Sequence, residues 1–71
     1  MNSSNTSKAI GKNIKHYRLK AGLSQVGLAK KAGINDNYYA RVERGEVSPT
    51  LEKYEKIAKA LKVKSSELLP F

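Results

Sequence analysis

The sequence contains no cysteine and no tryptophan, and it has no long apolar run. Without thiols the chain forms no disulfide, no thiolate zinc site and no iron–sulfur cluster. No stretch approaches the ~20 apolar residues that a membrane-spanning helix needs, so we expect no membrane partner. A length of 71 residues allows one small domain with a thin core. Such a domain has little room for a water-excluding active site.

Residues that bind metals or carry out catalysis are also scarce. His16 is the only histidine, and helical periodicity places it on the solvated side of the first predicted helix. It lacks the cluster of partners that a catalytic or metal site requires. The glycines do not have the spacing of a phosphate-binding loop. We therefore expect no enzyme activity, no catalytic residue, no metal, no cofactor and no small-molecule ligand.

Acidic residues are missing from the first half of the chain. Residues 1–35 carry seven of the 14 basic residues and none of the six acidic ones, so most of the net charge of +8 lies there. A segregated positive surface predicts a polyanionic partner. The alternative is a surface that is merely rich in lysine.

Apolar residues recur at helical spacing along the chain, and no strand pattern is present. The first helix is expected to end at Gly22 in a left-handed cap. Ser24 and Asn35 are predicted N-caps of the second and third helices. A fourth helix begins after Pro49, and Ser65 is expected to cap a final turn. The predicted fold is an all-α bundle of five short helices.

Two further expectations concern the ends of these elements. The polar residues 1–7 are expected to form a flexible N-terminal tail ahead of a single domain over residues 8–71. In the fourth helix, Leu51 is expected to share a buried stripe with Tyr54 and Ile57.

Residues 32–35 form a short glycine-containing turn between two short helices, which is the signature of a helix-turn-helix. On a helical wheel of residues 36–44, Tyr39 and Val42 define the inward direction. The outward face then carries Asn37, Ala40, Arg41 and Arg44. Asparagine can pair with adenine, arginine can form two hydrogen bonds with guanine, and alanine can touch a thymine methyl group. The alternative is an ordinary solvated helix, on which the same residues are common.

Several motifs together resemble one family. They are Leu23-Ser24-Gln25, Val42-Glu43-Arg44-Gly45 and the Ile-Ala-Lys-Ala-Leu run over residues 57–61. The chain is similar over residues 8–69 to the Cro/C1-type helix-turn-helix family, with its lambda-repressor-like DNA-binding domain. This family includes phage repressors, Cro proteins and the controller proteins of restriction–modification systems.

The resemblance implies a sequence-specific DNA-binding transcription regulator, such as a repressor, that is bacterial or phage-encoded and cytoplasmic. Its partners would be double-stranded DNA and a second copy of the chain. A homodimer would bind a two-fold symmetric operator, with the recognition helix, about residues 36–44, in the major groove. The rival interpretation is a protein-interaction module of the same fold, an antitoxin or bridging factor, for which DNA binding is secondary.

The resemblance also assigns roles to individual residues. The residues implied to read bases are Asp36, Asn37 and Arg41. Those implied to contact the DNA backbone are Ser24, Gln25, Tyr38 and Arg44. A structural ion pair is implied between Arg18 and Glu43.

The role of Asp36 and the place of the dimer interface each leave an alternative open. Asp36 is acidic and would face phosphates, so it either accepts a hydrogen bond from cytosine or only stabilises the helix N-terminus. The dimer interface is expected at Leu68, Leu69 and Phe71, because apolar residues at the chain end are hard for a thin domain to bury. Alternatively, Leu68 completes the monomer core and Phe71 frays with the terminus.

Overall fold

The computed structural model describes residues 3–71, and side chains from residue 5 onward. Within these residues the chain is all helical and has no strand, which confirms the predicted class. Four elements are α-helices and the last is a short 3-10 helix, so the fifth predicted helix is a single tighter turn. In chain order the elements are α1 (Ser3–Lys20), α2 (Gln25–Ala32), α3 (Asp36–Glu43), α4 (Leu51–Leu61) and η1 (Ser65–Leu68). None of the described helices has the length and apolar character to span a bilayer.

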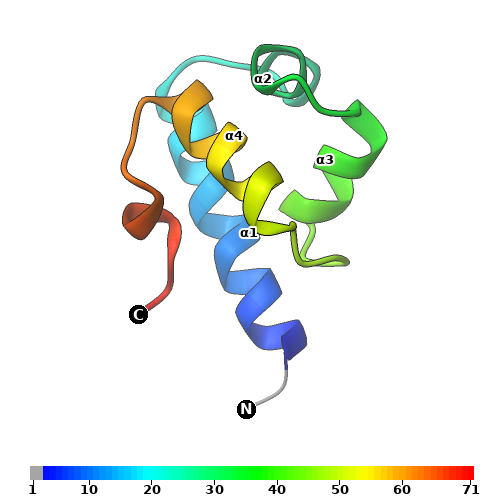
Figure 1. Cartoon of the computed structure of the whole chain (residues 1–71), viewed down its shortest axis with the longest axis vertical. Helices are drawn as coiled ribbons and strands as arrows, with labels where there is room; N and C mark the ends of the chain where they lie inside the picture. The colour runs from blue at the N-terminus through cyan, green and yellow to red at the C-terminus, as the bar shows by residue number, and fades with distance from the viewer. Residues whose placement is uncertain (1–2) are drawn as a thin grey trace.

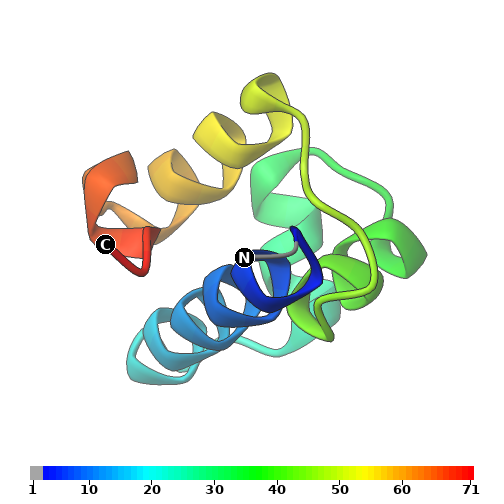
Figure 2. The same ribbon diagram turned by 90° about the horizontal axis from the view of Figure 1, so that it is seen from below.

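The four α-helices surround one small core. In Figure 1, α1 runs along the long axis of the molecule and α4 crosses in front of it, while α2 and α3 close the other side. Figure 2 shows α1 and α4 as separate rods with the link between α3 and α4 passing beside the start of α1. The largest fully buried side chains come from every element, and they are Ile14, Leu28, Tyr39, Val42, Ile57 and Leu68. All the helices therefore contribute to one shared core.

The start of α1 differs from the predicted tail. Residues 3–7 continue the helix, and Ser7 is buried at 5% exposure. The Ser7 hydroxyl hydrogen-bonds the Ser48 hydroxyl on the link between α3 and α4. This long-range contact gives the polar residues a place to pack, which their composition alone did not reveal. Residues 1 and 2 of the predicted tail lie outside the described residues.

The helix ends follow local signals. Ser24 and Asn35 accept hydrogen bonds from the N–H groups of Gly27 and Tyr38, which confirms both predicted N-caps. The corresponding cap of α4 is Thr50. The predicted cap at Ser65 is wrong, because η1 is preceded by Lys64, whose N–H donates to the Glu67 carboxylate at 2.8 Å. The Glu67 carboxylate accepts from the N–H ahead of the turn, whereas a Ser65 cap would accept from an N–H within it.

Leu51 does not lie on the buried stripe of α4. Its exposed fraction is 75%, whereas Tyr54 and Ile57 are buried at 7% and 0%. Leu51 is the first residue of the helix, and no neighbouring element covers that end. The periodicity is correct, but the core is shorter than the helix.

Candidate nucleic-acid interface

The link between α2 and α3 is a tight turn held by its own backbone. Gly33 adopts a left-handed conformation with φ of 73° and donates its N–H to the Lys30 carbonyl at 3.1 Å. The N–H of Ile34 donates to the Ala29 carbonyl at 2.9 Å. The Asn35 side chain then accepts from the N–H of Tyr38 at 2.9 Å and starts α3. One glycine and one cap thus set the direction in which α3 leaves α2.

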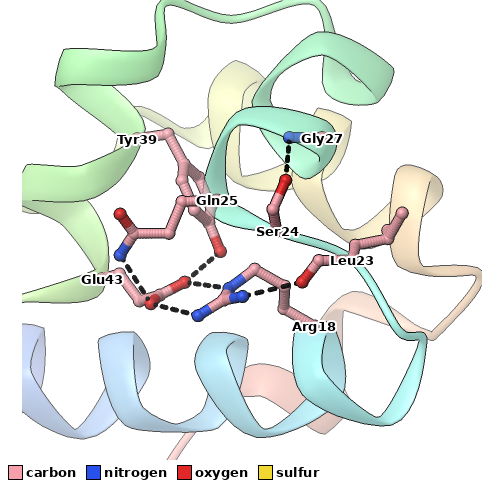
Figure 3. Close-up of polar contacts among 7 residues, drawn as sticks. All are labelled: Arg18, Leu23, Ser24, Gln25, Gly27, Tyr39 and Glu43. Carbon is pink, nitrogen blue, oxygen red and sulfur yellow. Dashed lines mark hydrogen bonds and ion pairs between the residues drawn. The ribbon is translucent and has the colours of Figure 1, made fainter.

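On the inner side of α3, the buried carboxylate of Glu43 joins α1, α2 and α3 (Figure 3). Glu43 accepts from Arg18 Nε at 2.8 Å and from a terminal nitrogen of the same guanidinium at 3.0 Å. Gln25 Nε2 donates to Glu43 at 2.9 Å, and the Tyr39 hydroxyl donates to it as well. Arg18 also donates to the carbonyl of Leu23 at 2.7 Å. We call Arg18, Gln25, Tyr39 and Glu43 the buried network.

The protonation states of the buried network follow from this geometry. Burial by itself would raise the pKa of Glu43, but hydrogen bonds from Arg18, Tyr39 and Gln25 outweigh it and lower that pKa. The hydrogen bond to Glu43 raises the pKa of Arg18. Burial raises the pKa of Tyr39, and its hydrogen bond to Glu43 adds to the effect. The pair Arg18–Glu43 therefore stays ionised, while Tyr39 stays neutral and donates its proton.

The structure brings Arg18 and Glu43 together as the implied ion pair, with side chains exposed at only 8% and 3%. Gln25 lies half-buried at the start of α2 and uses its amide nitrogen to brace Glu43. Ser24 uses its hydroxyl to cap α2 by accepting from the Gly27 N–H at 2.9 Å. Both are therefore engaged within the fold at the end of α2 where a phosphate contact is predicted.

The predicted base-reading residues all lie on the solvent side of α3. Asp36, Asn37 and Arg41 are exposed, whereas Tyr39 and Val42 are fully buried. The face of α3 that the wheel assigned to solvent is therefore the exposed one. Asp36 lies in the first turn of α3 and accepts a hydrogen bond from the N–H of Asn37 at 3.1 Å, and both of its predicted roles remain predictions.

Tyr38 occupies the flank of α3. It is half-buried against the core, and the Lys53 ammonium lies 5.9 Å from its ring centre. This contact connects α3 with α4. The predicted contact between Tyr38 and the DNA backbone remains a prediction, and it would have to involve the exposed part of this side chain.

Arg44 ends α3 as its C-cap and is exposed. Its Nε lies 2.7 Å from the carboxylate of Glu46, and Arg41 Nε lies 3.5 Å from the same carboxylate. Sequence analysis did not single out Glu46. The signal that could have found it is the Arg-Gly-Glu order at the helix end, because a glycine at this position turns the next residue back toward the last helical turn.

Leu68 is not available as an interface residue. Its side chain is fully buried in the monomer core, and its carbonyl accepts from Asn13 Nδ2 at 3.0 Å. The 3-10 turn folds back onto α1 and α4, which is why a residue near the chain end becomes part of the core. The other two predicted interface residues differ from it, since Leu69 is half-buried and Phe71 is 87% exposed.

Comparison with known proteins identifies this arrangement. A family model described as helix-turn-helix matches residues 14–68. The chain is 37% identical over 60 residues to the immunity repressor protein of Bacillus phage phi105, a match that covers 84% of this chain and 42% of the repressor. The chain thus spans less than half the length of that relative.

Two solved structures share the fold and are at least 30% identical in sequence. The restriction-modification controller protein C.AhdI from Aeromonas hydrophila superposes with a TM-score of 0.86 at 33% identity, covering 89% of this chain and 96% of the controller. The P22 c2 repressor, solved in complex with a synthetic operator, superposes with a TM-score of 0.79 at 30% identity, covering 86% and 92%. The chain belongs to the helix-turn-helix family, which is made of DNA-binding transcriptional regulators and not of enzymes.

Proposed function

We propose that this protein is a sequence-specific DNA-binding regulator that binds a two-fold symmetric operator as a homodimer, with α3 in the major groove. The observation that carries the proposal is the two-sided construction of α3. Its inner side is fixed by the buried network, and its outer side presents Asn37 and Arg41 one turn apart. A rigid helix with an exposed amide and an exposed guanidinium meets the geometric requirement for reading base edges.

In this proposal, one group of residues contacts the bases and another contacts the phosphates. Asn37 and Arg41 read bases, while the start of α2 and exposed lysines hold phosphates and set the register. The lysines of residues 8–31 are all exposed, which supports this role. The N–H groups at the start of α2 also favour an anion, because they carry the positive end of the helix dipole.

The buried network supports the proposal by fixing the angle of α3. Arg18 is in α1, Gln25 in α2 and Glu43 at the end of α3, so the three helices share one carboxylate. A misplacement of α3 would move both base-reading side chains together. The network therefore acts on DNA recognition through position and not through direct contact.

The dimer follows from the small size of the reading surface. One short helix covers too few base pairs for strong discrimination, and two copies related by a two-fold axis place their helices about 34–36 Å apart in successive major grooves. Leu69 and Phe71 form the remaining apolar surface near the chain end. That the related P22 c2 repressor was solved with an operator supports DNA as the ligand of this fold.

Selection of binding sites from random duplex DNA tests the proposal. We expect a palindromic consensus, with half-sites one helical turn apart. The affinity for the selected site should fall steeply with salt, at a log–log slope of about −0.9 for each phosphate contacted. No enriched sequence, or an affinity independent of salt, would contradict the proposal.

A further inference from the structure

The turn that follows α3 carries an exposed carboxylate, that of Glu46, which the proposed function does not use. Glu46 accepts hydrogen bonds from Arg44 at 2.7 and 3.3 Å, and its carboxylate lies 3.5 Å from Arg41 Nε. The three side chains are about half exposed, at 54% for Arg41, 55% for Arg44 and 48% for Glu46. One acid therefore engages both arginines of α3 on its solvent side.

The backbone holds Glu46 in this place. Its N–H donates to the Arg41 carbonyl at 2.9 Å, and the N–H of Gly45 donates to the Val42 carbonyl at 3.0 Å. These are the two hydrogen bonds of a Schellman helix end. Gly45 has a φ of 78°, and a Cβ there would lie 2.6 Å from Lys8 Cα. The turn is thus both left-handed and packed against α1, so Glu46 is anchored beside the arginines.

Pairing with Glu46 changes the charge that α3 offers to DNA. The two arginines and the acid together carry one net positive charge instead of two. The hydrogen bond from Arg44 lowers the pKa of Glu46, so the carboxylate is ionised at neutral pH. Arg41 meets this carboxylate through Nε, so the pair leaves the terminal nitrogens of Arg41 available to DNA.

We propose that Glu46 is a specificity-determining residue that suppresses binding of α3 to non-matching DNA. An unrelated duplex offers Arg41 and Arg44 mainly phosphates, which replace one anion with another and gain little. A matching site offers Arg41 guanine acceptors in a two-pronged geometry, which its terminal nitrogens can meet while Nε stays beside Glu46. Specificity is a difference between affinities. Because the pair with Glu46 is kept in the matching complex and broken in the non-matching one, only the weaker affinity is lowered. This inference rests on the proposed function.

The test compares Glu46→Gln with Glu55→Gln. Glu55 is an exposed acid on the solvent face of α4 that contacts neither arginine, so both variants lose one negative charge. Affinity is measured for the selected site and for a scrambled duplex at several salt concentrations. For the scrambled duplex, we expect Glu46→Gln to raise the affinity about two- to fivefold more than Glu55→Gln does. The salt dependence of Glu46→Gln binding to the scrambled duplex should steepen by about one phosphate contact. The ratio of its affinity for the selected site to that for the scrambled duplex should fall.

A second background separates pairing from direct repulsion. Glu46→Gln is repeated in the Arg41→Ala/Arg44→Ala variant, where its effect on the scrambled duplex should fall to that of Glu55→Gln. Equal effects of the two glutamine variants in the wild-type background would overturn the inference, as would a gain that persists without the arginines. A wild type that does not distinguish the two duplexes overturns the proposed function itself, and this is seen before any variant is compared.

Discussion

At the scale of single residues, the orientation of α3 depends on a buried ion pair. Replacing a buried ion pair with apolar residues is often neutral or stabilising, whereas removing one partner alone is costly. Glu43 and Arg18 are both buried, and the carboxylate has additional donors in Gln25 and Tyr39. The pair is directional, because the two-pronged contact fixes the angle between α1 and α3. We interpret the pair as fixing the position of α3. Removing only one of its partners should destabilise the fold more than replacing both with apolar residues.

The lowered pKa of Glu43 predicts acid sensitivity of the fold. Because folding lowers this pKa, the unfolded chain binds more protons than the folded chain at acidic pH. The stabilisation is present above the ordinary pKa of 4.5 and is lost as the pH falls through the lower, folded value. Urea unfolding between pH 3 and pH 7 should show the free energy of unfolding dropping on the acid side.

Glu43→Gln is the control for this pH dependence. It keeps the size of the side chain and one accepting oxygen but removes the titrating carboxylate, so the acid-side decrease should be shallower than in the wild type. Some decrease should remain, since the pKa of Glu46 is also lowered. An unchanged slope in Glu43→Gln would assign the acid sensitivity to other groups.

Arg41 and Asn37 should specify different base pairs. In Arg41→Ala, one position of the selected consensus should lose its preference, at a cost of about 1–3 kcal/mol for the matched base. Asn37→Ala should relax a neighbouring position. Repeating the random-site selection with each variant measures this. Gln25→Ala serves as the comparison and should weaken all sites about equally, because phosphates carry no sequence information directly. An unchanged consensus in Arg41→Ala would remove that residue from base reading.

At the scale of the elements, α1 and α3 pack backbone against backbone. Gly11 sits where a Cβ would lie 2.4 Å from the Glu43 carbonyl oxygen and 2.7 Å from that of Val42. This close approach brings the Arg18–Glu43 contact within reach. A glycine in the middle of a helix is unfavourable by itself, so here close packing explains its presence.

Gly11→Ala is expected to destabilise the fold by about 1–3 kcal/mol, because the added methyl group has to displace backbone atoms. It should also weaken DNA binding by shifting α3. Gly27→Ala is the matched control, since the nearest atom to its Cβ is the hydroxyl at the end of the Ser24 side chain, at 3.0 Å. Thermal unfolding of both variants tests the difference. Equal losses would show that backbone packing at Gly11 is not special.

The end of α4 carries a local strain that substitution can relieve. Lys62 caps the helix in the left-handed region with φ of 59°, and it is the only non-glycine residue with positive φ among the described residues. Lys62→Gly should stabilise the fold by about 1 kcal/mol, because the left-handed region penalises a Cβ. Lys62→Ala, which removes the charge but keeps the Cβ, should not. A melting temperature that rises equally in both variants would point to charge instead.

At the scale of the whole molecule, the domain is small and strongly basic, and its charge alone does not distinguish one DNA sequence from another. The net charge of +8 attracts any duplex, so discrimination has to come from geometry and, in the proposed homodimer, from the pairing of two copies. With Leu68 buried, the surface that remains for pairing near the chain end is Leu69 and Phe71.

Leu69→Asp with Phe71→Ala should shift the protein from dimer to monomer in sedimentation while the helical signal is kept. Operator affinity should fall while weak half-site binding survives. Leu51→Ala removes another exposed leucine at the far end of α4 and should leave the dimer intact. If Leu51→Ala dissociates the dimer instead, the interface lies at that end. A wild type that is monomeric at high micromolar concentration would contradict the dimer.

What the sequence determined by itself is mostly local. The caps at Ser24 and Asn35 and the left-handed Gly22 were predictable, because such signals act within three or four residues. The outward face of α3 was also predictable, since helical periodicity fixes which side chains share a side. The motifs of the helix-turn-helix family likewise lie within short stretches of sequence.

What only the tertiary structure decided depends on contacts between distant residues. Ser7 is helical and buried because Ser48 meets it, and Leu68 belongs to the core because the last turn folds back on α1. Leu51 has the same apolar character but is exposed, since no element reaches it. Apolarity and periodicity state what a residue favours, whereas burial depends on which partners the fold supplies.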